Sequence, residues 1–92
     1  MDSVEHDENE HRFVLAEAGG EAVLFYDLVD STTVDFRSTF VPPMLRGRSV
    51  GTRLVCHALA WARQRGLKVI PSCWFVSNVV ARRPEYIDLL TQ

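Results

Sequence analysis

The stretch that decides the fold is Val41-Pro42-Pro43-Met44-Leu45-Arg46-Gly47-Arg48-Ser49-Val50-Gly51-Thr52. Its two prolines end the strand-like run before it, because proline lacks a backbone N–H donor and presets a turn. A long amphipathic pattern follows directly, so the second half of the stretch is expected to begin a helix. The first N–H groups of a helix have no internal partner, and they favour an anion.

The second half of this stretch has the composition of a site for a diphosphate. Gly47 and Gly51 remove side chains where a phosphate would come close, and Arg46 and Arg48 add positive charge and hydrogen-bond donors. Backbone N–H donors are expected from Gly47, Ser49, Val50, Gly51 and Thr52. Ser49 is also expected to cap the helix through its hydroxyl. The alternative is a capped helix start with solvated arginines and no ligand.

Three strands are expected before this stretch. Residues 12–18 form the first, and Gly19-Gly20 is a hairpin signal. Residues 21–29 are apolar enough for a central strand that is buried on both faces. Residues 32–41 alternate as a half-buried strand does. One face of this third strand would carry Val34, Phe36, Ser38 and Phe40.

Two helices and one strand are expected after it. Residues 49–65 place apolar side chains on one arc at helical spacing, and Gly66 is the expected C-terminal cap. Residues 68–70 begin a short strand, and residues 74–83 form a second helix before the last helical turns at 85–90. The passage from strand to helix to strand implies parallel pairing with a right-handed crossover.

These elements predict an α+β fold with a mixed, mainly antiparallel sheet in the order β-β-β-α-β-α. The 92 residues are expected to form one domain, residues 1–92, in which residues 1–10 are an acidic tail or an edge strand. No run is apolar and long enough to span a bilayer, so no membrane partner is expected. An acidic N-terminus is unlike a secretory or transit peptide. With only two cysteines, a reduced, cytoplasmic setting is expected.

Charge is divided unevenly along the chain. Residues 1–45 hold ten acids and two arginines, for a net charge of −8, whereas residues 46–92 hold eight bases and two acids, for +6. The second half would attract a ligand that carries phosphate. Nucleic acid is not the expected partner, because the overall charge is −2 and no basic stripe with interleaved aromatic residues occurs.

Arg46-Gly47-Arg48-Ser49-Val50-Gly51 resembles the Gln/Arg-x-x-Gly-x-Gly/Ala signature of the GNAT acetyltransferase family, which binds the diphosphate of coenzyme A. A wider pattern resembles small GNAT-like proteins of the YjdJ type. It comprises Arg12-Phe13, Thr39-x-Val41-Pro42, Leu45-Arg46-Gly47, Ala58-Leu59-x-x-Ala62-Arg63, Gly66-Leu67-Lys68-Val69-x-Pro71-x-Cys73, Phe75-Val76 and Pro84-Glu85-Tyr86. The resemblance covers residues 4–90 and implies a minimal GNAT-like acyl-CoA acyltransferase fold that binds acetyl-CoA.

The resemblance also implies roles for residues outside the loop. The backbone N–H near Val41 would hold the thioester carbonyl oxygen, and Asn78 would bond the pantetheine arm. A plain strand end and a surface amide are the alternatives. Trp74 and Phe75 would pack against the coenzyme, line the acceptor site, or belong to the core.

Five positions depart from the family pattern. Ser49 replaces the first motif glycine, Ser38 a histidine, Phe40 a glutamate, Trp74 a proline and, at about its place, Val79 a tyrosine. Three of the groups replaced, those at Ser38, Phe40 and Val79, are polar candidates for catalysis in the family pattern. The departures therefore motivate a second hypothesis, a coenzyme-A-binding module with weak or no catalytic activity.

Cys73 is the candidate catalytic side chain, and three roles stay open for it. It could accept the acetyl group as a nucleophile, or it could donate a proton to the departing thiolate, because the acidity of a cysteine resembles that of an alkyl thiol. It could also be a small buried hydrophobe. His6 and His11 lack a third ligand at metal spacing, so no metal is expected.

The first functional hypothesis is an N-acetyltransferase that moves acetyl from acetyl-CoA to an amine by direct attack in a ternary complex. The acceptor amine could belong to a small molecule or to a protein. The alternatives are the coenzyme-binding module and a small scaffold without a ligand. No residue pattern in the sequence predicts the acceptor or the oligomeric state.

Overall fold

The computed structural model describes residues 3–90, and its elements follow the predicted order with one strand added in front. The elements are β1 (Val4–Asp7), β2 (Arg12–Glu17), β3 (Gly20–Asp30), β4 (Thr33–Phe40), η1 (Pro43–Leu45), α1 (Val50–Gln64), β5 (Lys68–Ile70), α2 (Trp74–Arg82) and η2 (Pro84–Leu89). Residues 4–7 of the acidic N-terminal segment thus form an edge strand.

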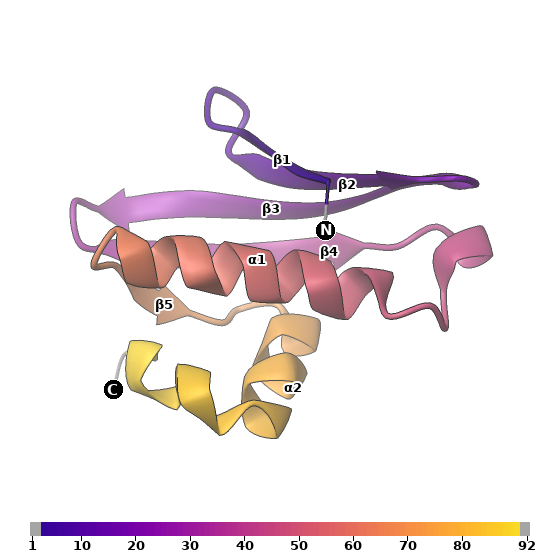
Figure 1. The fold of residues 1–92 in the computed structure, drawn as a ribbon. Coiled ribbons are helices and arrows are strands. Elements are labelled where there is room, and N and C mark those ends of the chain that lie inside the picture. The colour runs from indigo at the N-terminus through magenta and orange to yellow at the C-terminus, as the bar shows by residue number, and fades with distance from the viewer. Residues whose placement is uncertain (1–2, 91–92) are drawn as a thin grey trace.

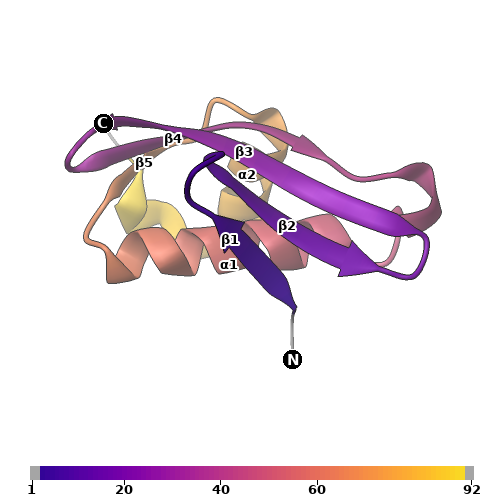
Figure 2. The same ribbon diagram turned by 90° about the horizontal axis from the view of Figure 1, so that it is seen from above.

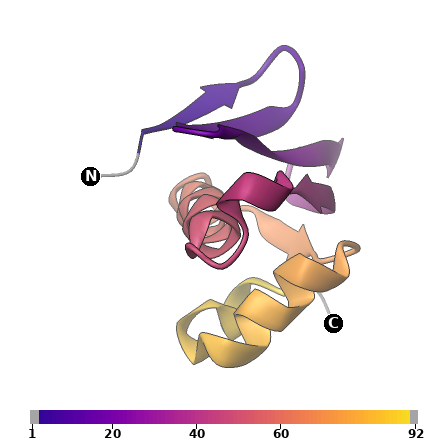
Figure 3. The same ribbon diagram turned by 90° about the vertical axis from the view of Figure 1, so that its right-hand side faces the viewer.

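The five strands form one sheet in the order β1-β2-β3-β4-β5. The first four strands pair antiparallel, and β4 pairs parallel with β5, with α1 as the connection between them. The helical elements all lie on one side of the sheet (Figures 1 and 3), and in Figure 2 β1, β2 and β3 lie in front of the helices. The predicted α+β fold class, with its mixed and mainly antiparallel sheet, is confirmed.

β3 is buried on one face only, so the prediction of a strand buried on both faces is wrong. Ala22, Leu24 and Tyr26 are buried, whereas Phe25 between them is 41% exposed. The cause is the one-sided arrangement of the helices, which cover a single face of the sheet. Along a strand, alternate side chains point to opposite faces, so every second residue of β3 faces away from the helices.

A bulge in β4 changes the predicted faces of that strand. Phe25 lies opposite Ser38 while the next residue, Tyr26, lies opposite Phe36, so Arg37 has no partner on β3. One extra residue moves every later side chain to the other face. Phe36 is buried as predicted, but Ser38 is exposed and Phe40 is 54% exposed. The prediction that Ser38 and Phe40 share the buried face of Val34 and Phe36 is therefore wrong.

α1 supplies the helical side of the core. Its buried residues are Val50, Gly51, Leu54, Val55, Ala58, Leu59 and Ala62. All of them except Gly51 were expected on the apolar arc of the helix, and Trp61, which was also expected there, is half-buried. The helix ends where expected, since Gly66 has a φ of +69° and the Leu67 N–H donates to the Ala62 carbonyl at 2.9 Å. Within residues 3–90, no helix has both the length and the apolar content required to cross a membrane.

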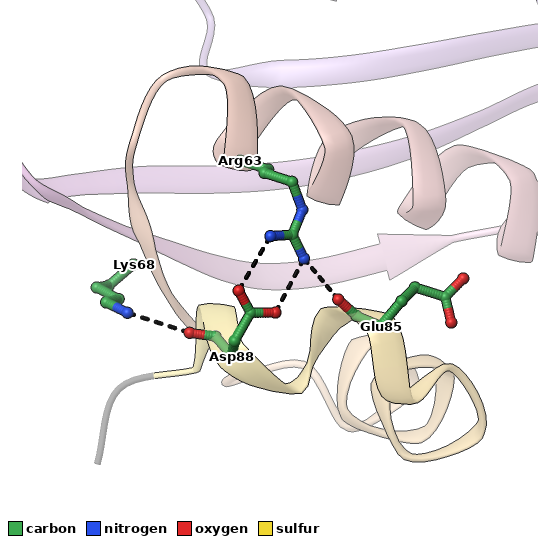
Figure 4. A network of polar contacts seen from close by, with 4 residues as sticks. All are labelled: Arg63, Lys68, Glu85 and Asp88. Atoms are coloured by element: carbon green, nitrogen blue, oxygen red, sulfur yellow. Dashed lines mark hydrogen bonds and ion pairs between the residues drawn. The ribbon is translucent and has the colours of Figure 1, made fainter.

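The C-terminal elements are fixed to the end of α1 by a polar network. The Arg63 guanidinium donates to both carboxylate oxygens of Asp88, at 2.9 and 3.0 Å, and to the Glu85 carbonyl. Lys68 Nζ donates to the Asp88 carbonyl at 3.1 Å. Figure 4 shows both cations reaching toward η2 from the two sides of the α1–β5 connection. This network holds η2, and with it the end of α2, in place.

Candidate functional site

The largest concentration of predicted site residues lies around a cavity of about 560 Å³. It is lined by Thr39, Phe40, Val41, Leu45, Arg46, Gly47, Ser49, Val50, Gly51, Thr52, Cys73, Trp74 and Phe75. The cavity therefore joins three parts of the fold, namely the end of β4, the start of α1 and the start of α2.

The cavity opens because β4 and β5 diverge. The two strands pair only from Thr33 with Lys68 to Asp35 with Ile70. One more backbone bond, from the Cys73 N–H to the Phe36 carbonyl at 2.9 Å, follows this ladder. Beyond it, Thr39 and Val41 from the end of β4 and Cys73 from the start of α2 line the cavity. A gap between parallel strands exposes backbone polar groups, which a ligand can bind.

The start of α1 presents its N–H groups without a side-chain cap. Ser49 occupies the N-cap position with φ 62° and ψ 17°, and its side chain makes no cap hydrogen bond. The predicted capping role of the Ser49 hydroxyl is therefore wrong, because the residue is in the left-handed conformation rather than the extended one that capping requires. Gly47 also has a positive φ, +82°. Successive backbone N–H groups in a turn of this kind form a concave set of donors suited to an anion.

The two loop arginines have different positions. Arg46 lines the cavity, and its Nε donates to the Val41 carbonyl at 3.0 Å, which ties the loop to the end of β4. Arg48 is exposed and lies outside the cavity lining. Among the lining residues, Arg46 alone carries a full charge, and none is a carboxylate or an imidazole. The lining thus combines one positive charge with apolar side chains, which suits a ligand that has an anionic group and a long apolar part.

Cys73 and Thr39 meet at the inner end of the cavity. Thr39 Oγ1 and Cys73 Sγ lie 3.5 Å apart, and Cys73 is only 8% exposed. The bulge at Arg37 explains this contact, since without it Thr39 would point to the opposite face of the sheet. The pair provides one hydroxyl and one thiol next to an otherwise apolar wall.

Most of the residues predicted from the sequence to form the site line this cavity. Eight predicted site residues line it, namely Val41, Arg46, Gly47, Ser49, Val50, Gly51, Thr52 and Cys73. Arg48 and Asn78 do not; Asn78 is exposed on α2. Trp74 and Phe75 line the cavity, as one of their expected roles requires. Thr39, Phe40 and Leu45 were missed as site residues, because the bulge that orients the first two leaves no signal in the residue pattern.

Histidine, cysteine and acidic side chains are not gathered anywhere in residues 3–90 as a metal would require, that is, in a group of three or more. His6 instead belongs to an aromatic cluster distant in sequence from the cavity. Its Nε2 lies 2.5 Å from the Tyr26 hydroxyl, and its ring stacks on Phe13 with centroids 4.1 Å apart. Burial lowers the pKa of His6 and raises that of Tyr26.

Comparison with known proteins agrees with this geometry. A family model described as GCN5-related N-acetyl-transferase matches residues 12–89. The chain is 34% identical over 89 residues to Protein NATD1 of Danio rerio, covering 92% of this chain and 81% of that protein. It is 33% identical over 91 residues to Protein NATD1 of Xenopus tropicalis, covering 95% and 84%.

The same relationship appears among solved structures. A GCN5-like protein from Staphylococcus aureus, determined by NMR in solution, superposes with a TM-score of 0.76 at 26% sequence identity. The match covers 97% of this chain and 87% of the other. A family that generally uses acetyl-CoA thus shares both sequence and fold with nearly the whole chain. The finer assignment to the YjdJ type stays a prediction. The chain belongs to the GCN5-related N-acetyltransferase (GNAT) family.

Proposed function

We propose that the protein transfers acetyl from acetyl-CoA to a primary amine by direct attack in a ternary complex. The observation that supports this most is the continuity of one cavity from the N–H groups of residues 47–52 to the Thr39–Cys73 pair. The diphosphate would bind at the first end, and the thioester would lie at the second. The pantetheine arm would run between them, past Gly51, Phe75 and Val41.

The diphosphate end would bind through backbone groups. The N–H donors of Gly47, Ser49, Val50, Gly51 and Thr52 belong to a loop and helix start that contain two left-handed residues, and the Ser49 side chain does not cap them. Arg46, held by its bond to the Val41 carbonyl, would add a guanidinium close to the phosphates. Arg48 would act through its charge from outside the cavity, and Asn78, on α2, would contact the ligand only if its side chain or the helix moved.

At the thioester end, the Val41 backbone N–H would hold the carbonyl oxygen as negative charge develops on it. The amine nitrogen forms a bond to the carbonyl carbon, and the carbon–sulfur bond of the thioester then breaks. Cys73 would donate its Sγ proton to the departing thiolate of coenzyme A, while the proton lost by the amine passes to solvent. The Thr39 hydroxyl would donate a hydrogen bond to the Cys73 thiolate that remains, across the observed 3.5 Å contact, and Cys73 would regain its proton from solvent before the next turnover.

The assay follows release of free thiol from acetyl-CoA over a panel of amines. The wild-type protein should release thiol with at least one amine, and Cys73→Ala should lower kcat by about 10²- to 10⁴-fold, the range of a lost general acid. Cys56→Ala is the matched control, because Cys56 lies outside the cavity lining. Turnover by Cys73→Ala at the wild-type rate would exclude a chemical role for Cys73. Intersecting initial-rate plots support a ternary complex, and parallel plots support an acetylated cysteine.

A second candidate function is a coenzyme-A-binding module without turnover. Two features of the cavity favour it. No carboxylate or imidazole lines the cavity, and Phe40 occupies the position of the family's glutamate. In that case acetyl-CoA would bind, but no amine would release thiol.

If the protein is an enzyme, the acceptor amine must lose its proton to solvent, because no side chain that lines the cavity is a carboxylate or an imidazole. The value of kcat/KM should then rise with pH up to the pKa of the acceptor amine itself.

A further inference from the structure

A second cavity adjoins the first at the start of α1. It has a volume of about 570 Å³ and is lined by Ser49, Thr52, Val79, Arg82, Arg83 and Glu85. Ser49 and Thr52 line both cavities. The second cavity therefore begins where the first one ends, between the start of α1 and the end of α2.

Two arginines of this second cavity have no partner among residues 3–90. Neither the Arg82 nor the Arg83 guanidinium forms a hydrogen bond or an ion pair with another described residue, whereas Arg63 is bound to Asp88 on both nitrogens. A basic residue in the last turn of a helix is common, because it complements the helix dipole. That explanation suffices for Arg82 alone, but not for two adjacent arginines beside a cavity that shares its wall with a diphosphate loop.

The backbone around these arginines is fixed. The Arg83 N–H donates to the Val80 carbonyl at 3.1 Å, and Pro84 begins η2 directly afterwards. η2 is in turn held by Arg63, which binds the Glu85 carbonyl and the Asp88 carboxylate. Figure 4 shows the Glu85 carboxylate directed away from the Arg63 guanidinium. The cavity thus carries two positive charges and one negative charge on a positioned backbone.

We infer that this second cavity binds the 3′-phosphate of coenzyme A through Arg82 and Arg83, an inference that rests on the proposed function. The 3′-phosphate and the 5′-diphosphate are attached to the same ribose, so a site for one must adjoin the site for the other. The second cavity meets that requirement, because it shares Ser49 and Thr52 with the first cavity, whereas Thr39 and Cys73 line the first cavity only. A phosphate monoester carries close to two negative charges at neutral pH, and guanidinium groups bind it with good geometry.

The experiment measures the affinity of coenzyme A and of 3′-dephospho-coenzyme A by calorimetry. The wild-type protein should bind coenzyme A about fivefold more tightly, the effect expected of two partly solvated charge contacts. Arg82→Gln/Arg83→Gln should weaken coenzyme A alone and bring the two affinities to within a factor of two. Glu85→Gln should strengthen coenzyme A relative to the dephospho form, because it removes the opposing charge of the cavity.

The matched control is Arg37→Gln/Arg65→Gln, which removes the same net charge at exposed positions that line neither cavity. It should keep the wild-type preference, whereas a general charge effect would reduce it equally. The single Arg82→Gln and Arg83→Gln variants give the same readout if the double variant folds poorly. A wild-type preference below twofold, or one that survives the double substitution, overturns the inference and leaves the proposed function intact. If neither compound binds the wild-type protein, the proposed function fails as well.

Discussion

Gly51 shows how closely the candidate site is packed at the level of single atoms. A Cβ at this position would lie 2.9 Å from Cζ of Phe75, 3.0 Å from its Cε2 and 3.2 Å from Cγ2 of Val41. Both neighbours line the cavity. The position has no positive φ, so its glycine is required by space and not by backbone conformation.

Gly51→Ala should therefore destabilise the protein and weaken acetyl-CoA binding. In a helix, alanine is favoured over glycine by about 1 kcal/mol, but overpacking against Phe75 and Val41 costs about 1–3 kcal/mol, so the free energy of unfolding should fall by roughly 1 kcal/mol. Chemical denaturation and calorimetry measure the two effects. In a Phe75→Leu background the same substitution should be neutral or stabilising. A Gly51→Ala variant as stable as the wild type, with Phe75 in place, would contradict this account.

At the scale of elements, the candidate site is formed by two irregularities placed next to each other. The bulge at Arg37 turns Thr39 toward Cys73, and the left-handed Ser49 begins α1 with its N–H groups uncapped. Neither a regular strand nor a capped helix would provide these groups. The loop between them is short and held by the bond from Arg46 to the Val41 carbonyl.

The regular elements of the fold could be predicted from the sequence, whereas the irregular features could not. Helix α1 was predictable because its apolar residues recur at helical spacing over four turns, and Gly66 marks its end. The site loop was predictable from prolines, glycines and arginines in one stretch. The bulge was not, because one unpaired residue leaves the alternation of β4 readable in either register. The exposed face of β3 could not be predicted either, since the apolar residues of this strand do not indicate on which side of the sheet the helices lie.

Ser49 allows a direct test of the conformation at the start of α1. Ser49→Gly should raise the free energy of unfolding by about 0.5–1 kcal/mol, because glycine adopts a positive φ without strain. Ser49→Ala should cost less than the roughly 1 kcal/mol typical of a lost N-cap, since the hydroxyl makes no cap hydrogen bond. Thermal and chemical denaturation give both values.

Gly47→Ala is the matched control for this pair of variants. Its φ is +82°, and nothing lies within 4 Å of an added Cβ, so the substitution adds backbone strain without a steric clash. It should destabilise the protein by about 1 kcal/mol. If Ser49→Gly proved less stable than Ser49→Ala, the left-handed assignment at Ser49 would be wrong.

At the scale of the whole molecule, the acidic N-terminal edge is fixed by aromatic packing in addition to the ion pairs of Asp7 with Arg12 and of Glu8 with Arg65. His6 of β1 is bonded to Tyr26 of β3, stacks on Phe13 and meets the Trp61 ring of α1 edge-on at 4.9 Å. These contacts join the two sides of the molecule at the end opposite the start of α1. Burial favours the neutral imidazole, and the pKa of His6 is lowered as a result.

The stability of the protein should therefore depend on pH near neutrality. In the window below the ordinary histidine pKa of about 6.5, His6 binds a proton in the unfolded chain but not in the folded one. The free energy of unfolding should thus fall as the pH is lowered from about 7 to 5.5, and the loss should be complete only below the folded pKa. His6→Phe keeps the ring stack and removes the titration, so its slope should be shallower. An unchanged slope would show that other groups cause the dependence.

The two adjoining cavities give the whole molecule a defined order of sites, from Thr39 and Cys73, past the loop at the start of α1, to Arg82 and Arg83. This order matches a ligand with a thioester at one end and phosphates at the other. Three arginines of the basic half, Arg46, Arg82 and Arg83, line these two cavities. Arg63, Arg65 and Lys68 instead contact Asp88 or Glu8 elsewhere in the fold.

The central claim is that the main-chain donors of residues 47–52 bind a diphosphate while the Thr39–Cys73 pair meets the thioester. A titration of the 15N-labelled protein with acetyl-CoA, followed by amide NMR shifts, tests it most directly. The largest shifts should fall at Gly47–Thr52, with a second group at Cys73–Phe75. Amides of these two segments that stay unmoved at a saturating concentration of acetyl-CoA would contradict the claim.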